Sequence, residues 1–249
     1  MEKFKKWAFI GDLHGNFEVA TKAGYWAIDN KARPIFLGDL TDSFSKTKRA
    51  QLYTIRFVRN LLDAGGICIW GNHDLSYINY EAFGCSGYTR NKQAYFREAY
   101  CELLTHKSFK PFYYIKKHDV LVTHAGLDPG IIPDHYPDDL HPTEILGYKF
   151  NEENSIALTK TTPFLKVGRN SGGHGIGGIT WLREPEATGS LGNTVQIVGH
   201  TPQDTCNFNN RTQTWYIDTI EYGDRSILML DEGGNFEIIE EQQWNLKEQ

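Results

Sequence analysis

Short apolar runs alternate with longer amphipathic stretches over the first part of the chain. The apolar runs at residues 8–10, 34–37 and 67–70 have the length of buried strands. Between them, residues 17–30 and 46–64 carry apolar side chains at helical spacing. This alternation of strand and helix predicts an α/β fold in which the strands run parallel.

The pattern becomes less regular farther along the chain. Residues 75–107 are helical in character but are broken by glycines, which predicts a helical cap or insert. Residues 129–178 are rich in Pro, Asp, His, Asn and Gly and predict a loop-rich insert. Short helices are expected within it near residues 143–147 and 151–158.

Further strand-like runs lie on either side of the loop-rich stretch. They are residues 112–115, 119–123, 195–198, 214–217, 227–230 and 236–239. A polar turn joins the first two, as in a hairpin. Turn signals separate the last three, which favours a mainly antiparallel second sheet in the tail.

Composition places the chain among ordinary globular proteins. It has 249 residues, of which 40% are hydrophobic and 23% are charged, enough for a sizeable core. We therefore predict a single domain over residues 1–249 that carries both inserts. The net charge of -5, with no Lys/Arg run longer than a pair, argues against a duplex-binding surface.

Cysteine usage and hydropathy bear on the cellular compartment. The four cysteines are scattered, without a Cys-x-x-Cys pair, which favours free thiols in a reducing, intracellular setting over a disulfide framework. The first apolar run is too short for the core of a signal peptide, and no later run approaches membrane length. The sequence thus predicts a soluble cytoplasmic protein, and it carries no signal for an oligomeric state.

Metal-competent side chains follow five of the strand-like runs. They are Asp12, His14, Asp39, Asn72, His124 and His200. Because open α/β sheets place ligands at the carboxyl ends of their strands, we expect these side chains to share one site. Two carboxylates, three imidazoles and an amide suit Mn²⁺, Fe or Zn²⁺ better than Ca²⁺, and the lack of thiolates argues against structural zinc. Asp39 is the candidate for bridging two ions.

Each of these turns has an ordinary explanation when it is taken singly. Gly-Asp is a common turn, and a lone histidine is more often a hydrogen-bonded polar residue than a ligand. Residues 71–74 could simply join a strand to a helix. Five such turns, each after an apolar run, are hard to assign to chance, and together they favour a shared metal site.

The same blocks, in this order, resemble those of the calcineurin-like metallophosphoesterase superfamily. They are Gly-Asp-Leu-His-Gly at 11–15, Gly-Asp-Leu-Thr-Asp at 38–42, Gly-Asn-His-Asp at 71–74, Thr-His-Ala-Gly at 123–126 and Gly-His-Thr at 199–201. The last block ends in Thr-Pro, whereas the phosphodiesterase branches usually carry a second histidine there. Residues 181–184 and 215–219 also resemble the phosphoprotein phosphatase (PPP) branch, particularly its small bacterial and bacteriophage serine/threonine phosphatases.

The resemblance implies a fold and a cofactor. The fold is a four-layer αββα sandwich of two mixed β-sheets flanked by helices. The cofactor is a pair of divalent ions, Mn²⁺ in vitro with Fe or Zn²⁺ as alternatives, whose shared hydroxide would attack the phosphorus without a covalent intermediate. Asp12, His14 and Asp39 would hold the first ion, and Asp39, Asn72, His124 and His200 the second.

Three further residues have catalytic roles by the same resemblance. His73 would be the general acid that protonates the leaving oxygen, and Asp42 would orient its other ring nitrogen. Arg183 would clamp the phosphate with its planar guanidinium. The plainer alternatives are a solvent-facing residue for His73, a turn-forming residue for Asp42, and a surface ion pair with Glu184 or Glu186 for Arg183.

Two positions depart from the phosphoprotein phosphatase pattern. Ser43 and Trp70 stand where that branch usually carries arginines. Their loss should weaken the hold on a dianionic phosphate, because charged hydrogen bonds contribute about 1.5–3 kcal/mol each. Arg183, Asn72 and Trp70 are the candidate substrate-binding residues. Trp70 could stack on a nucleobase or a phosphorylated aromatic ring, or it could simply pack at the strand edge.

The sequence therefore favours a metal-dependent, PPP-like phosphatase that hydrolyses phosphomonoesters, with phosphoproteins as the leading substrate. A second hypothesis is a nucleotide phosphoesterase acting on dinucleoside polyphosphates, cyclic nucleotides or nucleic-acid ends. A third is a protein that binds a phosphorylated partner without turnover. The intact metal set, with a proton donor beside it, argues against the third.

Overall fold

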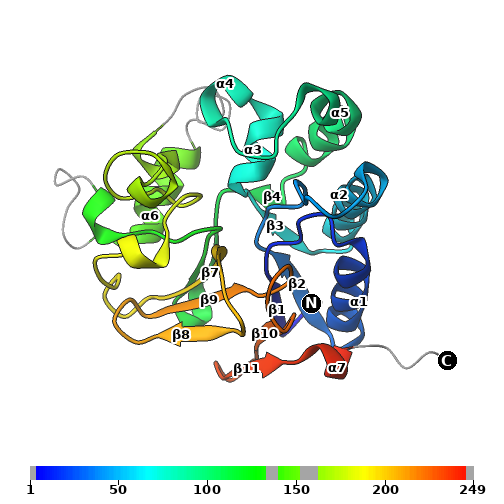
Figure 1. The fold of residues 1–249 in the computed structure, drawn as a ribbon. Coiled ribbons are helices and arrows are strands. Elements are labelled where there is room, and N and C mark those ends of the chain that lie inside the picture. Colours follow the sequence, from blue (N-terminus) through cyan, green and yellow to red (C-terminus); the bar gives the residue numbers. More distant parts are fainter. Residues whose placement is uncertain (1–3, 133–139, 152–161, 245–249) are drawn as a thin grey trace.

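The computed structural model describes residues 4–132, 140–151 and 162–244. Two mixed β-sheets face each other, and helices flank them, as Figure 1 shows. The predicted α/β sandwich is therefore confirmed.

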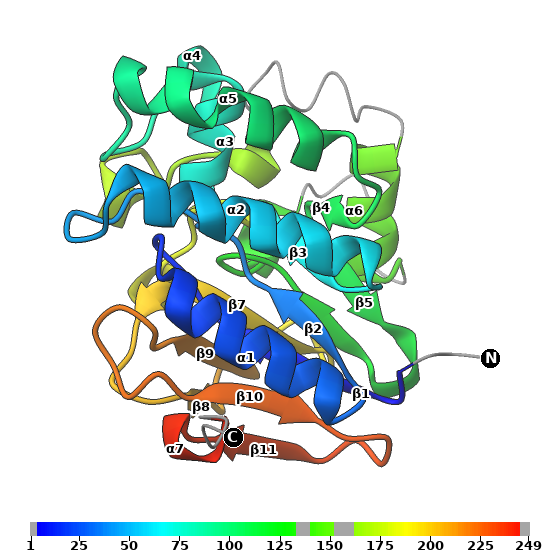
Figure 2. The ribbon, with the colours of Figure 1, turned by 90° about the vertical axis from the view of Figure 1, so that its right-hand side faces the viewer.

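The first sheet has six strands in the order β11-β10-β1-β2-β3-β4. Its strands are β1 (Lys6–Ile10), β2 (Ala32–Phe36), β3 (Ile67–Ile69), β4 (Phe109–Lys110), β10 (Ile227–Leu230) and β11 (Phe236–Ile239). Strands β1 to β4 run parallel, whereas β10 pairs antiparallel with both β1 and β11. Helices α1 (Phe17–Asp29) and α2 (Lys48–Asp63) make the crossovers and lie along one face of this sheet in Figure 2.

The second sheet has five strands in the order β5-β6-β7-β9-β8. They are β5 (Tyr113–Ile115), β6 (Val120–Val122), β7 (Val195–Pro202), β8 (Asn207–Asn209) and β9 (Thr214–Asp218). Strands β6, β7 and β9 pair in parallel, and the two edge strands pair antiparallel. The predicted antiparallel sheet in the tail is therefore wrong. The sequence pattern locates strands but not their partners, and β10 and β11 complete the first sheet instead.

Alternation along the strands decides which side chains fill the space between the sheets. Phe9 of β1, Ile35 of β2 and Ile197 of β7 belong to one buried cluster that draws members from both sheets. Ile10 and Phe36, the next residues along, belong to the cluster that includes α1 and α2. Burial of a side chain of this size contributes about 1.5–3 kcal/mol, so the strand ends are held firmly from both faces.

Helix α2 forms because its apolar side chains recur every three or four residues. Ile55, Val58 and Leu62 are buried in the cluster on the outer face of the first sheet. The Thr47 side chain accepts a hydrogen bond from the first turn and so caps the helix. The helix predicted from the apolar stripe is thus confirmed.

Further helices complete the described part of the chain. They are α3 (Asn72–Ile78), α4 (Tyr80–Phe83), α5 (Arg90–Leu104), α6 (Pro142–Asn151) and α7 (Glu241–Trp244), with 3-10 turns at Lys116–His118, Pro129–Ile131, Pro163–Leu165, Arg169–Ser171 and Glu184–Glu186. Figure 1 places α3, α4 and α5 above the carboxyl ends of the first sheet's parallel strands. Ile145 and Leu146 of α6 belong to the same buried cluster as Leu121 of β6. The predicted helical stretch at 75–107 is the end of α3 with α4 and α5.

Three short elements were not predicted from the sequence. Strands β4 and β8 have two and three residues, too few for a periodic pattern, and they form because a neighbouring strand pairs with them. Helix α7 is a single four-residue turn. The helix expected near 151–158 lies outside the described residues except for its first position. No helix in the described ranges is long and apolar enough to span a membrane.

Candidate metal centre

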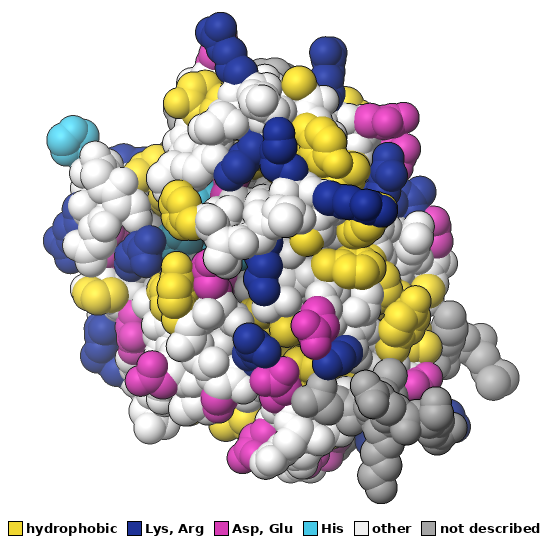
Figure 3. Space-filling view, turned by 45° about the vertical axis from the view of Figure 1, so that its right-hand side comes forward, with side chains coloured by type: hydrophobic (Ala, Val, Ile, Leu, Met, Phe, Trp, Pro, Cys, Tyr) yellow, Lys and Arg dark blue, Asp and Glu magenta, His cyan; other side chains and the backbone are white. Residues whose placement is uncertain are grey.

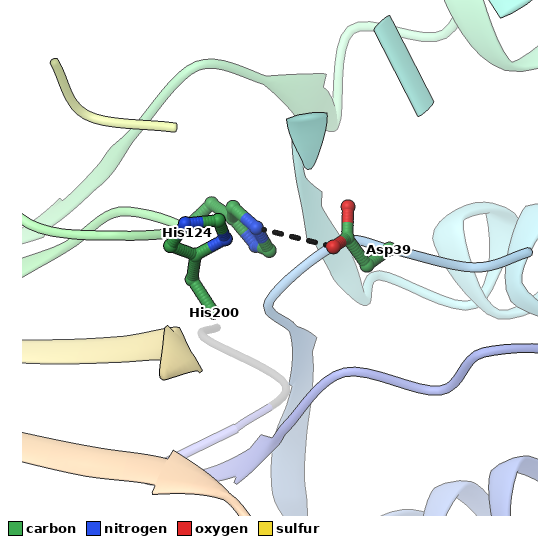
Figure 4. Close-up of side chains that lie close together, drawn as sticks. All are labelled: Asp39, His124 and His200. Atoms are coloured by element: carbon green, nitrogen blue, oxygen red, sulfur yellow. Dashed lines mark ion pairs between the residues drawn. The ribbon is translucent and has the colours of Figure 1, made fainter. Parts of the chain in front are cut away.

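The loops after β1, β2, β3 and β6 converge with the end of β7 at one edge of the sandwich, and they bring the six predicted ligands together. Two groups of donor atoms form there, each lying within 4.8 Å of one another: Asp12, His14 and Asp39, and Asp39, His124 and His200. Asn72 joins the second group through a contact of 2.8 Å between its Oδ1 and Nε2 of His124. Figure 4 shows Asp39 facing the two histidines of this group. Since Asp39 belongs to both groups, the arrangement suits two neighbouring ions.

Unusual backbone conformations present several of these side chains. His14, Asp39, Asp42 and His200 have positive φ angles of 40°, 48°, 73° and 62°. Such a conformation costs about 1–3 kcal/mol for a residue with a side chain and persists only where the surroundings enforce it. These four make up half of the eight non-glycine residues with positive φ in the described chain. Strain gathered at one place is typical of a functional site.

Two glycines let the carboxylates approach the backbone closely. A Cβ on Gly199 would lie 2.0 Å from Oδ1 of Asp12, and a Cβ on Gly71 would lie 2.2 Å from Oδ1 of Asp39. Both distances are far below van der Waals contact, so any side chain would displace the carboxylate. The glycines of the Gly-Asn and Gly-His blocks therefore make room for carboxylates from other loops.

Asp74 ties the loops after β2 and β3 together. Its buried carboxylate accepts hydrogen bonds from the backbone N–H groups of Asp39, Gly71 and Leu40 at 2.9, 3.1 and 3.0 Å. The Tyr100 hydroxyl donates to the same carboxylate at 2.8 Å. Hydrogen bonds to a charged acceptor are about twice as strong as neutral ones, so the two loops are fixed relative to each other.

Backbone carbonyls orient two of the imidazoles. Nδ1 of His14 donates to the carbonyl of Thr41 at 2.9 Å, and Nδ1 of His124 donates to the carbonyl of Leu37 at 2.6 Å. Each Nε2 is thereby left for the site. Nε2 of His124 faces Oδ1 of Asn72, an oxygen acceptor, so a proton or a cation must lie beside this nitrogen.

Two buried donor atoms at the centre have no hydrogen-bond partner in the described part of the chain. Among the described residues, Oδ1 of Asp12 and Nε2 of His200 make no hydrogen bond, although both residues are buried. An unsatisfied buried polar atom costs about 1–3 kcal/mol, and each one in a folded protein calls for an explanation. Two divalent cations, one held by the donor group of Asp12 and one by the donor group of His200, would satisfy both atoms, so the residues present fit a metal site.

The ionisable groups at the centre shift one another's pKa values. Burial, with the carboxylates of Asp218 and Asp39, raises the pKa of Asp12 well above its usual range. Burial lowers the pKa of His124, but Asp39 and Asp12 outweigh it and raise that pKa to about 10. Burial and the charge of His124 lower the pKa of His200 well below its usual range. A cation would favour ionised carboxylates and neutral imidazoles together, which relieves these conflicts.

His73 lies beside the two donor groups without belonging to either. Its Nδ1 donates to Oδ2 of Asp42 at 3.0 Å, and its Nε2 lies 4.0 Å from Oδ2 of Asp39. Burial lowers the pKa of His73, but Asp39 and Asp42 outweigh it and raise that pKa well above its usual range. Since the side chain of His73 is only 16% exposed, it is not a solvent-facing residue at a helix start.

The donor groups and His73 open onto a pocket with a volume of about 180 Å³, and Arg183 also lines it. Its guanidinium donates to Oγ of Ser171 at 3.2 Å and to the carbonyl of His200 at 3.4 Å. Among the described contacts, its glutamate neighbours have other partners: Glu184 accepts from Nδ2 of Asn209, and Glu186 accepts from the N–H of Gly177. The geometry therefore leaves Arg183 available to a bound anion.

Trp70, predicted as a substrate-binding residue, does not line this pocket but a different cavity of about 500 Å³. It shares the outer face of β3 with Cys68, and it packs on Phe109 and Phe150 with ring centroids 6.3 and 6.0 Å apart. Only 4% of its surface is exposed. These contacts favour the alternative, packing at the strand edge. Ser43, the other departure, uses its hydroxyl to close a turn.

Three aromatic residues line the pocket: Trp181, which opens the predicted block at 181–184, and Phe44 and Tyr222, which the sequence did not single out. Phe44 and Tyr222 are 86% and 69% exposed, which is unusual for side chains of this size. Figure 3 shows a hollow on this face, with histidine at its base and hydrophobic side chains beside it. Single aromatics in irregular loops have no periodicity, so no sequence signal marks them.

Donor groups that could hold two neighbouring metal ions are typical of metal-dependent hydrolases such as phosphatases and nucleases. A sequence model of the calcineurin-like phosphoesterase family matches residues 5–216. The chain therefore belongs to the calcineurin-like phosphoesterase family, and membership implies divalent metal ions.

Solved structures agree with this fold. A cold-active protein tyrosine phosphatase is 17% identical with a TM-score of 0.55, over 97% of this chain and 80% of that one. A protein serine/threonine phosphatase from Saccharomyces cerevisiae is 16% identical with a TM-score of 0.50, over 96% of this chain and 81% of that one. At these identities the likeness supports the fold alone. A comparison with curated proteins finds no significant sequence match.

Proposed function

We propose that the protein is a metal-dependent phosphomonoesterase. The observation that carries this proposal is the pair of donor groups that share Asp39, with the Asp42–His73 pair beside them in one pocket. Membership of the calcineurin-like phosphoesterase family supports hydrolysis of phosphoesters. His73, Arg183 and all the donor residues except the fully buried His124 line the same pocket, which is the combination that phosphoester cleavage needs.

The donor groups determine which residues would hold ions. Asp12, His14 and Asp39 would bind one divalent ion, and Asp39, Asn72, His124 and His200 would bind another. Such ions supply Lewis acidity toward phosphoryl oxygens and lower the pKa of a bound water. Nδ2 of Asn72 donates to Sγ of Cys85 at 3.2 Å, which turns Oδ1 toward the centre. Oxygen and imidazole donors suit Mn²⁺, Fe or Zn²⁺.

The chain's own side chains would handle the proton and the phosphate. His73, held at Nδ1 by Asp42, would give the proton on Nε2 to the leaving oxygen as the P–O bond breaks. Such a positioned general acid contributes about 10²–10⁴-fold to the rate. Arg183 would bind the non-bridging oxygens, where a guanidinium makes two parallel hydrogen bonds.

We favour phosphoproteins as the substrate because of the charges on the pocket wall. Arg183 is the single guanidinium that lines the pocket in the described chain, which suits one phosphate. Asp218 and Glu221 also line the pocket and would repel the further charges of a polyphosphate. Phe44 and Tyr222 offer apolar surface to a peptide or to a phosphorylated side chain.

A nucleotide phosphoesterase is the second candidate. The specific observation in its favour is again the exposed pair of Phe44 and Tyr222, since a flat nucleobase also stacks on aromatic rings. A mononucleotide would place one phosphate near Arg183 and is compatible with the acidic wall. Dinucleoside polyphosphates fit that wall less well.

A substrate panel in Mn²⁺ separates these candidates. Phosphotyrosyl and phosphoseryl peptides, AMP, cyclic AMP and diadenosine tetraphosphate would be compared by phosphate or product release. We expect kcat/KM for the better phosphopeptide to exceed that for any nucleotide by at least about 10-fold, equivalent to about 1.4 kcal/mol. Turnover of nucleotides alone would contradict the phosphoprotein assignment. If the metal-loaded protein binds these phosphate compounds but releases no product from any of them, the third hypothesis, a binding protein without turnover, would be favoured.

A further inference from the structure

The buried carboxylate of Asp42 has partners on both of its oxygens. Oδ2 accepts the hydrogen bond from Nδ1 of His73 at 3.0 Å. Oδ1 accepts from the hydroxyl of Tyr77 at 2.5 Å and from Nζ of Lys92 at 3.0 Å. The Asp42 side chain is 0% exposed, so these three donors take the place of its hydration shell.

Lys92 comes to this carboxylate from the helical insert. It belongs to α5, 50 residues after Asp42 in sequence, and its side chain is only 17% exposed. Its ammonium also donates to the carbonyl of Gly87 at 2.8 Å. Lysine is seldom this buried unless it is paired, because the ammonium loses its hydration. The hydrogen bond to Gly87 therefore links the loop before α5 to Lys92, which also contacts Asp42.

That loop lies directly against Asp42. Gly87 has a φ of 86°, and a Cβ at this position would lie 3.0 Å from Cβ of Asp42 and 3.1 Å from its Cγ. Asp42 itself has a φ of 73°, which a residue with a side chain adopts only when its surroundings hold it there. The loop and Lys92 together therefore restrict both the backbone and the carboxylate of Asp42.

We propose that Lys92 is a positioning residue for phosphoester hydrolysis, which acts by fixing Oδ1 of Asp42 so that Oδ2 stays on Nδ1 of His73. This inference rests on the proposed function. Without Lys92, Oδ1 would keep only the neutral hydroxyl of Tyr77, whereas the ammonium of Lys92 adds a second, charged donor that restricts rotation about the Cβ–Cγ bond. Nε2 of His73 then keeps its direction toward the reacting oxygen. The helical insert contributes to catalysis through this contact and is not merely a cover.

A leaving-group comparison distinguishes positioning of the proton donor from a merely structural role. Protonation matters most when the leaving oxygen is basic, as in phenyl phosphate, and least for p-nitrophenyl phosphate. A variant with a misplaced His73 should therefore lose activity mainly toward phenyl phosphate. A variant that is only less stable should lose activity toward both compounds equally.

The test compares Lys92→Met, Lys92→Arg and Arg97→Met in the Mn²⁺-loaded protein. Arg97 is an exposed residue of the same helix and serves as the matched control. For Lys92→Met we expect kcat for phenyl phosphate to fall at least about 10-fold and kcat for p-nitrophenyl phosphate to fall less than about 3-fold, with KM and metal content unchanged. Lys92→Arg should restore part of the loss, and Arg97→Met should behave as the unmodified protein.

Equal losses on both substrates, or no loss, would overturn the positioning role. An unmodified protein that hydrolyses neither compound would overturn the proposed function instead. A crystal structure of Lys92→Met gives a readout that needs no turnover. We expect the contact of 3.0 Å between Oδ2 of Asp42 and Nδ1 of His73 to be lost or lengthened, and an unchanged contact would also overturn the inference.

Discussion

Replacing Asp39 by alanine is expected to remove both metal ions and to abolish turnover. Asp39 belongs to both groups of donor atoms, with its Oδ2 3.4 Å from Nε2 of His124 and 3.9 Å from Nε2 of His14. Loss of a residue that only hydrogen-bonds to a metal ligand typically costs about 10–100-fold in metal affinity. Loss of the shared ligand itself should therefore cost more than about 100-fold at each site. Elemental analysis of protein loaded with Mn²⁺ and then dialysed measures this loss.

Asp128 provides a matched control for the removal of a buried carboxylate. It accepts hydrogen bonds from the backbone of Gly130 at 2.8 Å and from the hydroxyl of Thr188 at 2.7 Å, and it does not line the pocket. Asp128→Ala should lower stability but leave the metal content and kcat of the folded fraction unchanged. Retention of two ions and normal turnover by Asp39→Ala would show that Asp39 is not the shared ligand.

Replacing His73 by alanine is expected to lower kcat by about 10²–10⁴-fold while both ions stay bound. His73 contacts Asp42 through Nδ1 and belongs to neither donor group, so its removal takes away a proton donor and no ligand. The loss corresponds to about 3–5 kcal/mol of transition-state stabilisation. Steady-state kinetics on the favoured substrate, with metal analysis of the same sample, measures both quantities.

Two further variants place this result in context. Asp42→Asn should give a smaller loss in the same direction, because the imidazole remains but loses its charged partner. His174, an exposed histidine outside the pocket, should tolerate alanine without a change in kcat. A loss of metal from His73→Ala as large as that from Asp39→Ala would contradict the separate roles of these residues.

The convergence of the donor residues could be predicted because each follows an apolar run. A buried strand ends where the run ends, and parallel strands bring their carboxyl ends to one edge. His200 is the partial exception, since β7 continues through it to Pro202 with a shift in register. Gly199 marks that irregularity in the sequence, as glycine within a strand often does.

The strand pattern also predicts that Trp70 lies away from the pocket that holds the donor residues. Successive residues of a strand point to opposite faces, so Trp70 must lie on the face of Cys68 and opposite to Ile69. Although Trp70 is near Asn72 in sequence, the pocket lies beyond the strand end and not on that face.

Other features required the folded chain. The partners of β10 and β11 depend on which edge of which sheet is free, and a local pattern carries no such information. Phe44 and Tyr222 come together at the pocket from loops far apart in sequence. Lys92 and Asp42 are likewise joined only by the packing of the insert.

Anomalous scattering from a crystal of the Mn²⁺-loaded protein tests the central claim most directly. We predict two manganese peaks, roughly 3.5–4 Å apart, both in contact with Asp39, and each in contact with one of the two donor groups. Manganese that binds elsewhere, or no peak among these side chains, would contradict a shared dinuclear centre.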